Sequence, residues 1–173
     1  MNRIHASAIA VLGLSVGWTL FMWFLAGRSF RTAERVLSHS NPQVAETARP
    51  LAPDKERELV RHVASEINRT IFTAYGWAQI ALCALLVFLF VMQVPRDNFN
   101  LVLAALMLVL ALVLAIAVTP QIISIGRGMD FIPRTPQPPE FKRFWMLHGA
   151  FTGLDGLKLL AGLFLLGRLI LKK

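Results

Sequence analysis

Residues 99–118 read FNLVLAALMLVLALVLAIAV, a stretch without a charged side chain in which Asn100 is the one strongly polar group. A helix needs about 20 apolar residues to cross the roughly 30 Å of hydrocarbon in a bilayer. The stretch therefore predicts a transmembrane helix. Because almost nothing polar interrupts it, we expect it to be the most lipid-exposed helix of the chain.

The segment just before it predicts an antiparallel hairpin of two membrane spans. Residues 95–98 read PRDN, which is typical of a tight turn, and Asp97 or Asn98 can cap the following helix. A second apolar run at residues 71–94 precedes this turn. The two runs are thus expected to lie side by side.

Residues 54–70 predict an amphipathic helix that is continuous with the second span. Apolar side chains recur every fourth position from Leu59 to Ile71, and charged side chains occupy the other faces. Pro53 and Asp54 are start signals, and no breaker follows. One helix of roughly 40 residues would be about 60 Å long, so its first half must project from the membrane or lie on its surface.

Two further spans are predicted at residues 7–26 and 144–168, which gives four in a single domain over residues 1–173. Between the first two lies a basic loop at residues 27–70 that holds the amphipathic helix. The segment at residues 119–143 is rich in proline and glycine, and we expect it to be irregular and to lie outside the hydrocarbon. The expected fold is an all-α, polytopic membrane protein: a four-transmembrane-helix bundle with a long amphipathic cytoplasmic extension of the second helix.

Composition supports a membrane protein over a soluble one. The chain has 173 residues, of which 55% are hydrophobic and 16% charged, and its net charge is +8. The basic residues crowd beside the apolar runs without a motif of stacking aromatics, which favours anionic lipid head groups over nucleic acid as the partner. Cys83, the single cysteine, lies inside an apolar run and can form neither an internal disulfide nor a cysteine metal site.

The distribution of basic residues predicts the orientation. The two long loops hold twelve lysines and arginines: Arg28, Arg31, Arg35, Arg49, Lys55, Arg57, Arg61, Arg69, Arg127, Arg134, Lys142 and Arg143. The other side holds five: Arg3, Arg96, Arg168, Lys172 and Lys173. By the positive-inside rule the long loops are cytoplasmic and both termini are outside, in a plasma or inner membrane.

The fourth span carries an unusual polar stripe. His148, Thr152 and Asp155 are spaced i, i+4 and i+7, with Lys158 three residues further on. One interpretation is a proton or cation site centred on Asp155. The other is local neutralisation, in which Asp155 pairs with Lys158 or keeps its proton and hydrogen bonds within the bundle.

Other helices offer partners for this stripe. Tyr75 and Gln79 share one face of the second span with Cys83 and are candidates to hydrogen bond with Asp155 or His148. Glycines at small-residue spacing predict close packing between the first and fourth spans. They are Gly13, Gly17, Gly149, Gly153 and Gly156.

No catalytic, metal or cofactor site is predicted. A haem held by two histidines would need both on facing helices, and of the four histidines only His148 lies within a span. A metal site built from His39 and His62 in the loop is less favoured still. We expect the chain not to be an enzyme.

The start of the fourth span, residues 144–149 (FWMLHG), followed by Thr152 and Asp155, resembles the C-terminal signature of the transmembrane protein 205-like family. In that family the last helix carries an aromatic-x-x-His-Gly segment, small hydroxyl residues and an asparagine. The first span is also similar in its order of residues, and Pro120 resembles the proline that closes the third helix. The matching positions in the first span are Gly17, Met22, Trp23, Gly27, Phe30 and Arg31.

The resemblance implies a small multi-span membrane protein of a family with no assigned biochemical activity. Three positions depart from its pattern: Phe151 stands where a serine is expected, Asp155 where an asparagine is expected, and Gly156 where a leucine is usual. If the family needs only a hydrogen-bonding group at position 155, the aspartate there is structural.

Two functional hypotheses follow. The leading one is a non-enzymatic membrane protein that acts through helix packing and lipid contact, as an assembly or accessory subunit or a homo-oligomer. The alternative is a small ion, proton or solute carrier that uses the stripe of His148, Asp155 and Lys158.

Overall fold

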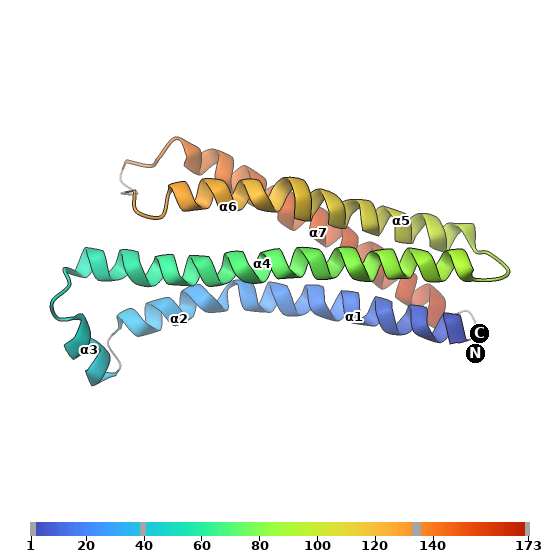
Figure 1. Cartoon of the computed structure of the whole chain (residues 1–173), viewed down its shortest axis with the longest axis horizontal. Helices are drawn as coiled ribbons and strands as arrows, with labels where there is room; N and C mark the ends of the chain where they lie inside the picture. The colour runs from blue at the N-terminus through green and yellow to red at the C-terminus, as the bar shows by residue number, and fades with distance from the viewer. Residues whose placement is uncertain (1–2, 39–40, 133–135, 172–173) are drawn as a thin grey trace.

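The computed structural model describes residues 3–38, 41–132 and 136–171 of the chain, and every regular element in these ranges is a helix (Figure 1). No strand occurs in them. His39 and three of the counted basic residues, Arg134, Lys172 and Lys173, lie outside these ranges. The all-helical prediction is therefore confirmed for the described part of the chain.

The first two helices form an almost continuous rod. α1 (Arg3–Ala26) contains the predicted span, and after a turn at Gly27 the chain continues as α2 (Arg28–Leu37). A short helix, α3 (Pro42–Ala48), follows, and the Asn41 side chain caps it by accepting a hydrogen bond from the Gln43 backbone N–H. α3 lies at the end of the molecule opposite to both chain termini (Figure 1).

The longest element is α4 (Pro53–Met92), a single helix of 40 residues. As predicted, the amphipathic segment and the second apolar run are continuous. Pro53 lies in the first turn, where backbone N–H groups have no partner within the helix, so its missing N–H costs nothing. The negative charges of Asp54 and Glu56 in the same turn interact favourably with the positive end of the helix dipole. The helix therefore extends well beyond a bilayer's hydrocarbon at about 1.5 Å per residue.

The helix that contains the third predicted span is longer than the sequence predicts. α5 (Asn98–Leu112) is capped by Asp97, passes into a π-helix (Val113–Val118) and continues as α6 (Thr119–Gly128). The prediction of an irregular segment from residue 119 is wrong for these first ten residues. A π-helical turn re-routes backbone hydrogen bonds ahead of Pro120, which lacks an N–H, so the helix continues past the proline.

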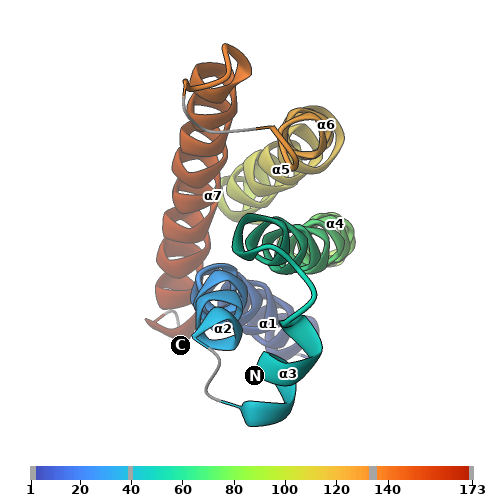
Figure 2. The ribbon, with the colours of Figure 1, turned by 90° about the vertical axis from the view of Figure 1, so that its left-hand side faces the viewer.

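α4 lies at the centre of the arrangement. It packs against α1 and α2 on one side and against α5 on the other, while α7 (Glu140–Leu171) packs along α1 and α5 (Figure 2). The buried residues form two apolar clusters, one around Leu86 and Phe90 and one around Tyr75 and Phe151. Both chain ends lie at one end of the molecule (Figure 1).

Three helical segments are long and apolar enough to cross a membrane: Arg3–Leu37, Pro53–Met92 and Asn98–Gly128. Large apolar side chains cover much of the outer surface, as is expected for helices that face lipid. Examples are Phe21, Phe24, Phe88, Val102, Ile116, Leu160 and Phe164. α7 is not among the three segments, so the fourth span stays a prediction.

Candidate functional site

Asp155 and Lys158 lie together on the inner face of α7. Their exposed fractions are 0% and 1%, and Lys158 Nζ lies 2.7 Å from Asp155 Oδ1. Positions three apart share a face of a helix, so both side chains meet the same neighbours. The two opposite charges compensate each other where a lone charge would carry a large desolvation cost.

Side chains from two other helices complete the hydrogen bonding of this pair. The Tyr75 hydroxyl of α4 donates to Asp155 Oδ1 at 2.7 Å and accepts from Lys158 Nζ at 2.9 Å. The indole N–H of Trp23 on α1 donates to Asp155 Oδ2 at 2.9 Å. Both carboxylate oxygens are therefore occupied, and the charged pair joins three helices.

The network extends between α1 and α4. Ser15 Oγ donates to Gln79 Oε1 at 2.7 Å, and Gln79 Nε2 donates back to the Ser15 carbonyl oxygen at 3.0 Å. Thr19 Oγ1 lies 3.0 Å from the Tyr75 hydroxyl and connects the two parts. We call this set the central polar network. Its members are Ser15, Thr19, Trp23, Tyr75, Gln79, Asp155 and Lys158.

The four residues that were predicted to form one polar stripe on α7 fall into two groups in the structure. Thr152 is exposed and donates to the His148 carbonyl oxygen of its own helix at 3.0 Å, and His148 stacks on Phe144 with ring centroids 5.9 Å apart. Neither joins the central polar network. Thr152 directly follows the buried Phe151, and successive helical residues are turned by about 100°, so its side chain leaves the inner face.

The predicted glycine packing is wrong at four of its five positions. A Cβ placed on Gly13, Gly17, Gly149 or Gly153 would meet nothing within 4 Å, whereas one on the fifth, Gly156, would lie 3.7 Å from the Trp23 ring. Close approach occurs instead at two other glycines. A Cβ on Gly162 would lie 3.1 Å from Val16 of α1, and one on Gly76 would lie 2.9 Å from the Cβ of Ala115.

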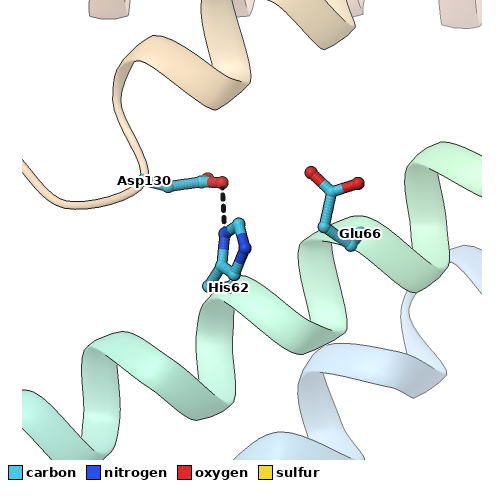
Figure 3. A group of neighbouring side chains, drawn as sticks. All are labelled: His62, Glu66 and Asp130. Atoms are coloured by element: carbon cyan, nitrogen blue, oxygen red, sulfur yellow. Dashed lines mark hydrogen bonds and ion pairs between the residues drawn. The ribbon is translucent and has the colours of Figure 1, made fainter.

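A second group of charged residues lies at the end of the molecule that holds α2, α3 and α6. His62 and Glu66, one turn apart on α4, face Asp130 in the turn after α6 (Figure 3). His62 Nδ1 lies 2.7 Å from Asp130 Oδ2, and Arg69 donates to both oxygens of Asp130 at 2.7 Å. Arg127 donates to both oxygens of Glu66 at 3.0 Å. We call these five residues the outer charged cluster.

The contacts within the outer charged cluster favour an ion-pair network over a metal site. The ligand atoms of His62, Glu66 and Asp130 lie within 4.8 Å of one another, a spacing that suits a metal ion. However, Arg69 and Arg127 already hold both carboxylates, and a metal ion would have to displace them. The arrangement joins the end of α6 to the first half of α4.

The arginines shift the acidity of both carboxyl groups. Hydrogen bonds from Arg127 and Arg69 lower the pKa of Glu66 from its ordinary 4.5 to about 2. Burial raises the pKa of Asp130, but hydrogen bonds from Arg69 and His62 lower it by more, so that the net shift is downward. Both groups are therefore held as carboxylates over the whole physiological pH range.

A cavity of about 1050 Å³ lies between the two sites, with walls from α2, α4, α6 and α7. At its inner end Phe72 and Phe151 meet edge to face with ring centroids 5.4 Å apart. Tyr75 and Asp155 lie one helical turn beyond these rings, and no member of the central polar network is among the described residues that line the cavity. The rings separate the cavity from the charged pair.

Several residues of the two sites are not singled out by the sequence. Ser15, Thr19 and Trp23 recur every fourth residue on α1, a polar stripe that could have been read from the sequence. Serine and threonine are common in membrane helices, so the stripe carries a weak signal. The contacts of Asp130 to α4 join residues more than sixty positions apart and have no local pattern.

A family model for a domain of unknown function (DUF4149) matches residues 50–129, which covers α4 to α6. The match includes Tyr75 and Gln79 but neither α1 nor α7. It agrees with an uncharacterised family, and the similarity to the transmembrane protein 205-like family stays a resemblance. Neither the curated proteins nor the solved structures contain a match to the chain.

Proposed function

We propose that this chain is a four-span integral membrane protein that acts without catalysis, as an assembly or accessory subunit. One observation carries the proposal: the charged groups of the central polar network satisfy one another. Asp155 has a partner on each oxygen, and Lys158 contacts both Asp155 and Tyr75. A group used in this way stabilises the helix arrangement and is not free to bind a substrate.

α7 is the fourth span in this proposal. It has 32 residues, about 48 Å at 1.5 Å per residue, and it packs along α1 and α5. Asp155 and Lys158 enter the membrane as a neutral pair, which lowers the cost of insertion. The two termini at one end of the molecule agree with an even number of spans (Figure 1).

The end with α2, α3 and α6 faces the cytoplasm in this proposal. Arg28, Arg31 and Arg35 lie on α2 just beyond the apolar part of α1 and are exposed. Basic side chains at this depth are attracted by anionic lipid head groups by about 1 kcal/mol each. The positive-inside rule and this contact favour the same orientation.

An outward glycine face supports a role in assembly. Gly149 and Gly153 are exposed and have open space where a Cβ would be, so a helix of another chain can approach α7 closely there. Gly149→Leu with Gly153→Leu should reduce co-purification of partner chains or higher oligomers in mild detergent, whereas Ala84→Leu, at an exposed position of α4 with no small residue four positions away, should not. A parent protein that purifies as a lone monomer would contradict the assembly role.

The cavity favours one alternative, a carrier. It ends at Phe72 and Phe151, one turn from Asp155, so motion of these rings would connect it with the charged pair. Ion flux in proteoliposomes should then depend on pH in the parent and fall in Asp155→Asn, with monodispersity of the variant as the folding control. Flux that is absent, or equal in both proteins, removes the carrier and leaves the assembly role.

A further inference from the structure

The cavity next to the outer charged cluster is lined in part by aromatic side chains. Six aromatic rings line it: Phe30, Phe72, Phe141, Phe144, Trp145 and Phe151. Its volume of about 1050 Å³ is at the upper end of the range for small-molecule sites in proteins. Along α4 its lining extends from Pro53 to Phe72, about 28 Å at 1.5 Å per residue. Such an elongated space, charged at its outer end and aromatic at its inner end, suits a chain-like ligand.

Two buried polar atoms in the wall have no partner. Thr119 Oγ1 and His148 Nδ1 are the buried side-chain polar atoms without a hydrogen bond in the described part of the chain, and both residues line this cavity. Thr119 is only 6% exposed. An unsatisfied buried polar group is unfavourable, so two of them on residues that line one cavity point to a ligand that supplies the missing bonds.

The charges at the outer end of the cavity do not favour an ion. Arg61 pairs with Glu34 at 2.7 Å, and Arg69 pairs with Asp130 at 2.7 Å. Three arginines face four acids across the whole lining: Arg57, Arg61 and Arg69 with Glu34, Asp54, Glu58 and Asp130. Because these charges nearly cancel, the cavity offers no strong attraction to an anionic or a cationic head group.

We propose that the cavity binds a neutral amphiphile, whose head carries carbonyl or hydroxyl oxygens and whose tail is apolar. Thr119 Oγ1 can donate or accept, and His148 Nδ1 does either according to its tautomer, so both suit such oxygens. The aromatic rings contact the apolar part. Two sources share this chemistry, an acylglycerol and a prenyl quinone. The proposal does not depend on the assembly role.

The test uses the full chain in detergent micelles with native mass spectrometry as the readout. The probes are 1-monooleoylglycerol, decylubiquinone and, as an anionic control, oleate. We expect one bound neutral molecule per chain, and oleate should compete poorly. Preference for the first probe identifies an acylglycerol, and preference for the second identifies a quinone. Failure of both neutral probes to bind, or equal binding of oleate, would overturn the proposal.

Matched variants locate the site. Thr119→Val and His148→Phe each remove one unpaired atom and should weaken binding roughly three- to tenfold, the value of one neutral hydrogen bond. Thr152→Val makes the same chemical change on an exposed face of α7 and should leave binding unchanged. Equal effects at Thr119 and Thr152 would contradict the proposal.

A third variant covers the case in which those changes disturb folding. Ile123 lines the cavity and is only partly buried, so Ile123→Trp can fill the space without entering the core. We expect it to abolish binding of the neutral probe while the protein stays monodisperse. A monodisperse Ile123→Trp protein that binds like the parent would place the ligand elsewhere and sink the proposal.

Discussion

The central polar network and the outer charged cluster use the same chemistry in two different solvents. In the first, Asp155 and Lys158 are almost fully buried and share their bonds with uncharged side chains. In the second, Glu66 and Arg127 keep 35% and 60% of their side-chain surface exposed and belong to a chain of alternating charges. Arg69 and Asp130 of the same cluster are only 11% and 8% exposed, so water and salt act mainly on Glu66 and Arg127.

This difference separates two uses of an ion pair. A buried pair contributes little net stability over an apolar alternative, yet loss of one partner is costly because the other charge stays buried. An exposed pair can lose a partner and be solvated, at a cost of about 0–1 kcal/mol. The central network therefore specifies one helix arrangement, whereas the outer cluster adjusts how firmly α6 is held to α4.

The largest effect is expected from Lys158→Met. It leaves the Asp155 carboxylate buried with only Tyr75 and Trp23 as donors, and should cost about 3–5 kcal/mol of unfolding free energy in mixed micelles. Lys142→Met, at an exposed position, is the matched control. Adding Asp155→Leu to Lys158→Met should restore much of the loss. If Lys158→Met costs no more than the control, the buried pair does not specify the helix arrangement.

A smaller effect is expected from Gly76→Ala, which tests the packing beside the central network. The added Cβ would lie 2.9 Å from the Cβ of Ala115, so α4 must move away from the π-helix and Tyr75 moves with it. Overpacking of this kind costs about 1–3 kcal/mol. Gly153→Ala, where nothing lies within 4 Å, should be neutral or stabilising. Equal thermal unfolding of both variants would refute close packing at Gly76.

Arg69→Met tests the outer cluster and should cost about 1–2 kcal/mol, because Glu66 stays near water whereas the Asp130 side chain is only 8% exposed and keeps His62 as its partner. Arg69 donates to Glu66 and Asp130, whereas Arg57 on the same helix is exposed and makes no ion pair in the described residues. Arg57→Met is therefore the control. Raising salt should reduce the difference between the parent and Arg69→Met, because screening acts on exposed charges. A difference that is independent of salt would place the cluster in a dry environment.

The smallest effect concerns pH. The pKa of Glu66 is lowered from 4.5 to about 2 in the folded protein by Arg127 and Arg69. Its stabilising contribution is therefore present above about pH 4.5 and is lost as the pH falls from there toward 2. Between pH 5 and pH 3 the thermal midpoint of the parent should fall more than that of Glu66→Gln. Parallel falls would show that Glu66 is not held by its arginines.

The helices could largely be predicted from the sequence, and their interruptions could not. The length of α4 follows from an apolar period without a breaker. The continuation of α6 past Pro120 depends on a π-helix at Val113–Val118, and its six apolar residues carry no signal for it. A proline within a helix either kinks it or ends it, and the sequence alone does not show which.

The charged pair of α7 could be found because charges are conspicuous in an apolar run. Tyr75 and Gln79 share a helix face, which made them candidates, and the structure places both in the central polar network. The position of Thr152 shows the limit of the method. A stripe at i, i+4 and i+7 is broad, and only contacts with other helices decide which part of it is buried.

The central polar network also implies an order of events during biosynthesis. The ribosome delivers α1 and α4 before α7, so Ser15 and Gln79 can pair while residues 155 and 158 do not yet exist. The Tyr75 hydroxyl can bond with Thr19 in the meantime, but the Trp23 indole N–H has no Asp155 to bond with until the last helix arrives. Chains truncated before α7 would keep this donor unpaired and the inner faces of α1 and α5 uncovered, a state that a quality-control protease could distinguish from the finished protein.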